Sequence, residues 1–419
     1  MKHITLLSIA LICSCASWNA PLMYGQGIPD TARRIELPLR VEPLPVLPEA
    51  LREDAPLDHD WSRGLTIVSS DRQMQLQVQA SIRNLAVING HRMAVPSSFT
   101  TADIPVGEAA AFDPHFYDDL RQTRLALVGM RESEVGRIIL RLETDFNGSD
   151  GFRLRHAYAE FGDVLVGQTW SLFSHVTLLP MMVDLNGPLG ANANLFPQIR
   201  YRLRDLLQDT ELTIGAEFVD HTVTSFDSTG IQSSQVLPDP VIRARRSTDW
   251  GMVEASLVLP LIAGRYGVAQ DLQVQVGWGL SASAAVDVDP QTRIYVNTAF
   301  GQGVADAFPT LAGKGRTVHV NPASDEVQLA FTASGFIAGE YQWTAAMRSM
   351  VALSALTHDT RAYDPSTTYR WGWQLAANTF WDVFSGMRLG LEWAVGSRAN
   401  VDAATGLATR VSSLLYYEL

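Results

Sequence analysis

The sequence predicts an all-β protein: a single antiparallel transmembrane β-barrel of about 16 strands, with a proline-rich N-terminal extension. Three observations support this prediction. Polar and apolar residues alternate along most of the 419-residue chain, arginines gather on the polar side of that alternation, and the chain begins like an exported protein. Strict alternation is typical of a strand that has one apolar and one polar face. Strands of about nine to eleven residues are long enough to cross a bilayer when tilted.

The composition narrows the possible function classes. The chain has 32 basic residues, of which only Lys2 and Lys314 are lysine, against 44 acidic residues, so its net charge is -12. A general nucleic-acid binder needs a basic surface, so we expect no nucleic-acid partner. Cys13 and Cys15 are the only cysteines, which excludes a disulfide framework or a zinc–thiolate cluster in the body of the protein. No apolar run reaches the roughly 18 residues of a membrane-spanning helix.

The first residues are predicted to be an export signal. Residues 1–16 combine a short basic start, an apolar stretch and a series of small residues, which is typical of a secretory signal peptide; its boundary could extend to residue 27. A lipid on Cys15 is a less favoured alternative. Residues 28–60 contain six prolines and are predicted to be an extended periplasmic linker. Three polar residues within it, Asp58–Asp60, are more typical of a solvated linker than of a metal site.

The barrel itself is predicted to occupy residues 65–419. The alternation is unbroken in Gln73–Ala80 and recurs along the chain. Sixteen segments are predicted as strands, at 73–89, 122–131, 136–146, 152–162, 164–171, 198–204, 210–219, 240–247, 250–260, 271–282, 291–301, 326–335, 338–350, 367–378, 386–397 and 408–418.

The predicted connections between these strands are of two kinds. The short ones are 132–135, 162–163, 247–249 and 335–337, and the long ones are 90–121, 172–197, 220–239 and 302–325. Short turns at one end and long loops at the other are typical of outer-membrane barrels.

Arginines occupy the polar face of several predicted strands. In 136–146, Leu140 and Leu142 share one face, and Arg137 and Arg141 share the other. A charged side chain facing the middle of a bilayer costs about 2–4 kcal/mol, so the arginine face is predicted to line a water-filled pore. The predicted pore-lining residues are Arg137, Arg141, Arg153, Arg155, Arg200, Arg202, Arg204, Arg243 and Arg245. A secreted, soluble β-sandwich binding module with a solvated polar face is the alternative.

Strict alternation has a consequence for the strand at 152–162. If Arg153 and Arg155 point inward, His156 and Glu160 must point outward. Polar side chains are unfavourable against lipid, so these two residues are predicted to lie at an interface between subunits.

Four motifs in residues 152–201 follow one another in a specific order. They are Phe152–Gly162, Leu165–Phe173, Asn186–Gly190 and Gln198–Tyr201. This succession resembles the DcaP-like family of outer-membrane porins. The resemblance implies a trimeric, sixteen-stranded barrel in the outer membrane of a Gram-negative-type bacterium, which passes small anionic solutes such as dicarboxylic acids. Family members often carry a helical segment ahead of the barrel, whereas the corresponding region of this chain is rich in proline.

The connection at 172–197 is too long for a tight turn. It contains several proline, glycine and asparagine residues, which are typical of an irregular loop. We predict that it folds into the barrel and narrows it, with Asp184 and Asn186 lining the constriction. The alternative is a loop that lies outside the barrel.

The sequence lacks the motifs of common catalytic sites. It contains no Gly-x-Ser-x-Gly, no phosphate-binding Gly-Lys loop and no His-Glu-x-x-His. We therefore predict a passive channel that is not an enzyme and needs no cofactor or metal, because bore and fixed charge are enough for selectivity. Its expected partners are small anionic solutes, outer-membrane lipid and two further copies of the chain.

Overall fold

The computed structural model describes residues 64–419, apart from 72, 135, 208, 222–231, 234–236, 267–270, 322 and 325. The predicted signal peptide (1–16) and proline-rich linker (28–60) lie outside the described residues. In the described part, no helix is both long and apolar enough to cross a membrane. The helical segments there are short 3-10 turns, namely η2 (Thr101–Asp103), η3 (Gly107–Ala110), η4 (Val176–Leu178) and η5 (Ala305–Ala307).

The described strands form a closed antiparallel barrel. The main sheet has 18 strands, of which β1 (Leu65–Val68) and β3 (His115–Asp119) pair only with β2, so the wall has 18 − 2 = 16 strands. In order around the wall these are β2 (Met74–Asn89), β4 (Arg124–Ser133), β5 (Gly136–Asp145), β6 (Arg153–Phe161), β7 (Val164–Trp170), β8 (Leu195–Leu207), β9 (Thr210–Glu217), β11 (Asp239–Thr248), β12 (Gly251–Val258), β15 (Trp278–Asp287), β16 (Thr292–Gln302), β19 (Phe331–Thr344), β20 (Met347–His358), β21 (Tyr369–Phe384), β22 (Met387–Asn400) and β23 (Thr405–Glu418).

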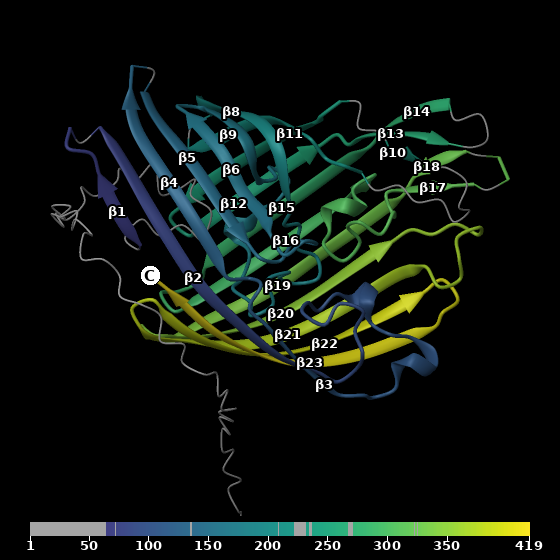
Figure 1. Ribbon diagram of the computed structural model, residues 1–419. Helices are drawn as coiled ribbons and strands as arrows, with labels where there is room; N and C mark the ends of the chain where they lie inside the picture. Colours follow the sequence, from purple (N-terminus) through teal and green to yellow (C-terminus); the bar gives the residue numbers. More distant parts are fainter. Residues whose placement is uncertain are drawn as a thin grey trace, which may run out of the picture. The chain divides into compact units, whose positions relative to one another are not determined.

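Pairing between the first and last wall strands closes the barrel. Residues 81–89 of β2 pair with residues 418–410 of β23, so the purple and yellow ends of the wall meet in Figure 1. Closure removes the exposed strand edges that an open sheet would have. It confirms the predicted barrel and excludes the two-layer sandwich that the sequence left as an alternative.

The connections differ in length between the two ends of the barrel. At one end, tight turns such as 162–163, 249–250 and 385–386 join neighbouring strands. Gly162 has a φ of 60°, a left-handed conformation that favours glycine in such a turn. At the other end, long connections follow β2, β7, β9 and β16. This is the arrangement of outer-membrane barrels, in which short turns face the periplasm and long loops face outward.

Two of the predicted strand boundaries are wrong. No turn occurs at Gly335–Ile337, because β19 runs without a break from 331 to 344 and the turn follows at 345–346. A glycine inside a strand can mark the close approach of another backbone instead of a turn, and the loop residue Gly190 packs directly on Gly335.

The predicted strand 271–282 is also divided, into β14 (Asp271–Val276) and β15, with Gly277 between them. Together with β13 (Leu261–Tyr266) and β10 (Gln232–Ser233), β14 forms a small three-stranded sheet separate from the wall. A two-stranded sheet of β17 (Val318–Val320) and β18 (Val327–Leu329) belongs to the connection between β16 and β19.

The outer face of the wall is apolar. In β20, Val351 and Leu353 are exposed while their neighbours Ala352 and Ser354 are buried. The exposed aromatic side chains Trp343 and Trp381 lie close to the tight turns. An apolar outer band with aromatic side chains near its edges is typical of barrels that contact lipid.

The hydrophobic core lies inside the barrel. Small inward-facing side chains such as Ala338, Ala352 and Ala376 pack in one cluster with the loop residues Leu178 and Met182. Alanines on the wall therefore leave the space that long connections need to enter the barrel.

The apolar outer face predicts a depth-dependent cost of charge. Leu353→Arg, at the middle of β20, should destabilise the barrel by about 2–4 kcal/mol, because its charge would lie in hydrocarbon. Val288→Arg, in the exposed connection after β15, should cost at most about 1 kcal/mol. Denaturant titration in lipid vesicles would measure both values. Equal costs for the two variants would contradict the assignment of the lipid-facing band.

Candidate functional site

The connection between β7 and β8, residues 171–194, lies against inward-facing side chains of the wall. His175 places Nδ1 2.8 Å from Ser283 Oγ on β15 and Nε2 2.8 Å from Ser256 Oγ on β12. All three residues are buried. We call residues 171–194 the inner loop.

The inner loop also reaches the far side of the barrel. The backbone N–H groups of Val183 and Asp184 donate to the Glu392 carboxylate on β22, at 2.9 and 3.2 Å. The N–H of Leu189 donates to Gln374 Oε1 on β21 at 2.9 Å. The loop therefore crosses the interior from β12 to β22, and side chains of the wall satisfy its backbone donors.

Gly190 brings the inner loop backbone into contact with the wall. A Cβ atom on Gly190 would lie only 2.9 Å from the backbone nitrogen of Gly335 on β19. The neighbouring Ser334 donates its hydroxyl to the Gly190 carbonyl at 3.2 Å. The absence of a side chain on Gly190 thus allows a backbone-to-backbone approach that a larger residue would prevent.

Arg410 on β23 connects the inner loop to a second connection, residues 90–114. Its guanidinium is 1% exposed and lies 3.0 Å from Asp184 Oδ2. It also donates to Pro96 O and Ser98 O at 2.8 and 2.9 Å. Asp184, which the sequence placed at the constriction, is thus buried in an ion pair that holds two connections together.

A third connection, between β16 and β19, meets the other two. Asn194 donates to Ala307 O at 2.8 Å, and Lys314 Nζ lies 2.5 Å from Asp103 Oδ1. Residues 99–100, 186–189, 191 and 308–310, one group from each connection, line a small pocket that is partly open to solvent. Asn186, the second predicted constriction residue, is in this lining.

The arginines of β5 and β6 form one network with acidic residues. Arg141 lies 2.5 Å from Glu143, and Arg155 lies 2.9 Å from the same carboxylate. Arg153 pairs with Asp145 at 2.5 Å. Most of these side chains are buried, so the acids neutralise charge that water does not reach.

Further arginines pair in the same way on the following strands. Arg202 lies 3.4 Å from Glu160 and 3.5 Å from Glu211. Arg245 lies 2.7 Å from Glu254, and both are buried. At the other predicted positions, Arg243 lies 3.7 Å from Glu211 and Arg137 lies 2.6 Å from Glu132.

Most of the predicted pore-lining arginines are therefore paired with carboxylates. Solvent reaches the side chains of Arg137 (34% exposed), Arg153 (38%) and Arg202 (14%). Arg200 is half-buried, and among the described residues no carboxylate lies within 4.0 Å of its guanidinium. The side chain of Arg204 lies outside the described part. Sequence analysis did not assign a role to the pairing acids, although they alternate on the same face as the arginines.

A β-bulge corrects the prediction for His156 and Glu160. Glu143 pairs with His156 and Thr144 pairs with Leu154, so Arg155 is an extra residue on β6. An extra residue reverses the inward–outward alternation for the residues that follow it. Arg155 and His156 are therefore both buried, although they are adjacent in sequence.

Both residues therefore have partners within the chain, where sequence analysis placed them at a subunit interface. His156 Nδ1 lies 3.0 Å from Thr169 Oγ1, and Glu160 pairs with Arg202.

Comparison with known proteins agrees with this architecture. The family model of the DcaP outer membrane protein matches residues 68–220. The matched segment, which is less than half of the chain, is similar to this family. This confirms the resemblance seen in residues 152–201 and the predicted outer-membrane location. No curated protein sequence matches the chain.

Solved structures share the fold of this barrel. The outer membrane channel DcaP of Acinetobacter baumannii superimposes with a TM-score of 0.74 at 21% identity, covering 85% of this chain and all of that one. The anion-selective porin from Comamonas acidovorans has a TM-score of 0.53 at 12% identity, covering 83% and 100%. The trimer form of OmpT from Vibrio cholerae has a TM-score of 0.52 at 9% identity, covering 83% and 99%.

The network around Arg410 predicts that this residue holds the inner loop in place. Arg410→Ala would leave Asp184 buried without its cation, and breaking such a pair costs about 3–5 kcal/mol. We expect the inner loop to detach from the wall while the barrel stays folded. Single-channel conductance in planar bilayers would then be higher and would fluctuate more than in the wild type. Arg370→Ala, at an exposed site on β21, is the matched control. Wild-type conductance in Arg410→Ala would show that the ion pair does not hold the loop.

The glycine contact makes a separate prediction for the inner loop. Gly190→Val should push the loop away from β19, because no space exists for the side chain. Gly339→Val is the control, because Gly339 is also on β19 and a Cβ atom there would have no heavy atom within 4 Å. It should leave conductance unchanged. If both variants behave like the wild type, the backbone contact has no part in setting the bore.

Proposed function

We propose that this protein is a passive, non-enzymatic porin for small hydrophilic solutes, with a preference for anions such as dicarboxylates. The observation that carries the proposal is the placement of solvent-reached arginines on the inner wall. Arg153 and Arg202 are paired and partly exposed, and Arg200 has no carboxylate within 4.0 Å among the described residues. Arginine stays charged at any working pH, so such a wall attracts anions at all times.

The surroundings of Arg200 support the preference. Arg200 acts electrostatically on Glu217 and Tyr158. Glu217 is itself engaged, since Ser171 Oγ and the Leu172 N–H donate to its carboxylate at 2.7 and 2.6 Å. Its oxygens therefore serve the inner loop, and the guanidinium of Arg200 keeps donors for a passing anion.

The chain's acidic balance does not oppose this proposal. Several acids lie on exposed connections, where salt screens them over about 8–10 Å at physiological ionic strength. Charges that line a narrow, low-dielectric passage act on an ion much more strongly than charges outside it.

Assembly and export are part of the same proposal. We propose a homotrimer, because the porin fold is found in a trimer form in OmpT from Vibrio cholerae. Residues 1–16 would direct export and be removed, and residues 28–60 would remain as a periplasmic linker. The inner loop and the two connections that meet it would form the constriction of each subunit.

Charge reversal at the inner wall tests the proposal. In planar bilayers with a potassium chloride gradient, the wild type should prefer chloride over potassium. Arg200→Glu combined with Arg202→Glu should reverse this preference, because two positive charges become negative. The reversal potential measures the ratio of the two permeabilities.

Arg246→Glu is the matched control, since Arg246 is exposed next to the inward-facing Arg245 on β11. This variant should keep the chloride preference. A cation preference in the wild type, or equal effects of the two charge reversals, would contradict the proposed anion selectivity.

A further inference from the structure

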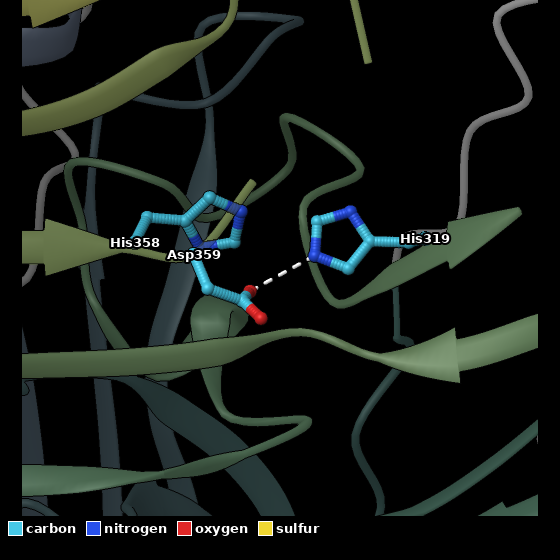
Figure 2. Close-up of side chains that lie close together, drawn as sticks. All are labelled: His319, His358 and Asp359. Carbon is cyan, nitrogen blue, oxygen red and sulfur yellow. Dashed lines mark hydrogen bonds and ion pairs between the residues drawn. The ribbon is translucent and has the colours of Figure 1, made fainter. Parts of the chain in front are cut away.

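Three metal-ligating side chains come together where the connection between β16 and β19 meets the end of β20. His319 lies in β17, His358 ends β20, and Asp359 begins the connection to β21 (Figure 2). One ring nitrogen of each histidine and one oxygen of Asp359 lie within 4.8 Å of one another. His319 Nε2 lies 2.9 Å from Asp359 Oδ1. We call these three residues the His–His–Asp cluster.

Both imidazole rings are buried, and each has a partner at Nδ1. His319 Nδ1 lies 3.2 Å from Asp364 Oδ2, and His358 Nδ1 lies 3.0 Å from Thr332 Oγ1. This leaves Nε2 of each ring for a ligand. Histidines that bind metal ions almost always use their second nitrogen for such a hydrogen bond, which fixes the ring and raises its basicity.

The carboxylate of Asp359 is also fixed by neighbouring groups. Asp359 Oδ1 accepts the backbone N–H of Phe331 at 2.8 Å, and Oδ2 lies 3.0 Å from Arg361 Nη1. Once an ion replaces the contact between Oδ1 and His319 Nε2, Oδ1 accepts only the Phe331 N–H and has a lone pair for the ion. Arg361 and the nearby Arg316 offset the charge of Asp359 and Asp364, so the site has no strong negative charge.

We propose that His319, His358 and Asp359 bind a divalent transition-metal ion, for which Zn²⁺ is the probe. Two imidazole nitrogens, one carboxylate oxygen and a water form a common zinc set. Zinc needs these atoms at about 2.0–2.2 Å, so the three side chains must close on the ion by roughly 1 Å. Because the ligands come from two connections, the ion would fasten β17 to the connection between β20 and β21.

A protonated His319 between two carboxylates is the arrangement that competes with the metal. Burial acts to lower the pKa of His319, but hydrogen bonds to Asp359 and Asp364 outweigh it and raise the pKa. A metal ion must displace this proton, so binding is measured at about pH 8, where protons compete least.

Direct zinc binding tests the proposal. The full chain in detergent, freed of metal with a chelator, is titrated with Zn²⁺ against a chromophoric competitor. We expect one Zn²⁺ per chain with a Kd on the order of micromolar. His319→Gln and His358→Gln should each weaken binding by about 100-fold or more. Asp364→Asn should weaken it by about 10–100-fold, as for other partners of metal-bound histidines.

His115→Gln is the matched control, because His115 lies on β3 and is not part of the cluster. It should bind zinc as the wild type does. A heat-modifiability gel shows that each variant is folded, and X-ray absorption of the bound zinc should show two imidazole ligands. The proposed site would be wrong if the wild type bound no stoichiometric zinc, or if the variants of the His–His–Asp cluster bound zinc as tightly as the wild type. This outcome does not depend on which solutes the channel conducts.

Discussion

The need to pair charge inside a closed wall shapes the interior of this barrel. An ionised side chain that leaves water loses several kcal/mol of solvation free energy unless a partner of opposite charge compensates for it. Arg141, Arg155 and Arg245 are all buried, and each has a carboxylate within 3.0 Å. The acids that meet them are as necessary to the wall as the arginines. Arg200 differs because it is half-buried and none of the carboxylates in the described part of the chain lies within 4.0 Å of it.

The same requirement explains how the inner loop is held. A loop inside a barrel brings backbone donors into a space with little water, and each donor needs an acceptor. Glu392 accepts the N–H groups of Val183 and Asp184, and Glu217 accepts that of Leu172. The carboxylates of the inner wall thus serve two purposes. Some neutralise arginines, and others bind the inner loop.

Much of the fold could be predicted from the alternation of polar and apolar residues, because successive side chains of a strand point to the lipid and to the interior in turn. The lipid side of β20, with Val351 and Leu353 exposed, is predictable in this way. Alternation fails at a bulge, and nothing in the residues 152–162 marks Arg155 as the extra one. The turn predicted at Gly335 was wrong for a related reason. A Cβ on Gly335 would lie 2.9 Å from the Asn297 carbonyl of the neighbouring strand, and a glycine required inside a strand looks the same in sequence as a glycine required by a turn.

Partners distant in sequence were the other feature that the sequence did not supply. Asp184 and Arg410 are 226 positions apart, and His319 and Asp359 are 40 apart, so no local pattern connects either pair. Arg410 also explains why Asp184, predicted from the sequence to line a constriction, is buried instead. Its charge keeps Asp184 buried, which removes a negative charge from the path of a permeating ion. With that acid neutralised, the electrostatic field that an anion meets near the inner loop depends mainly on the arginines that solvent reaches, Arg200 foremost among them.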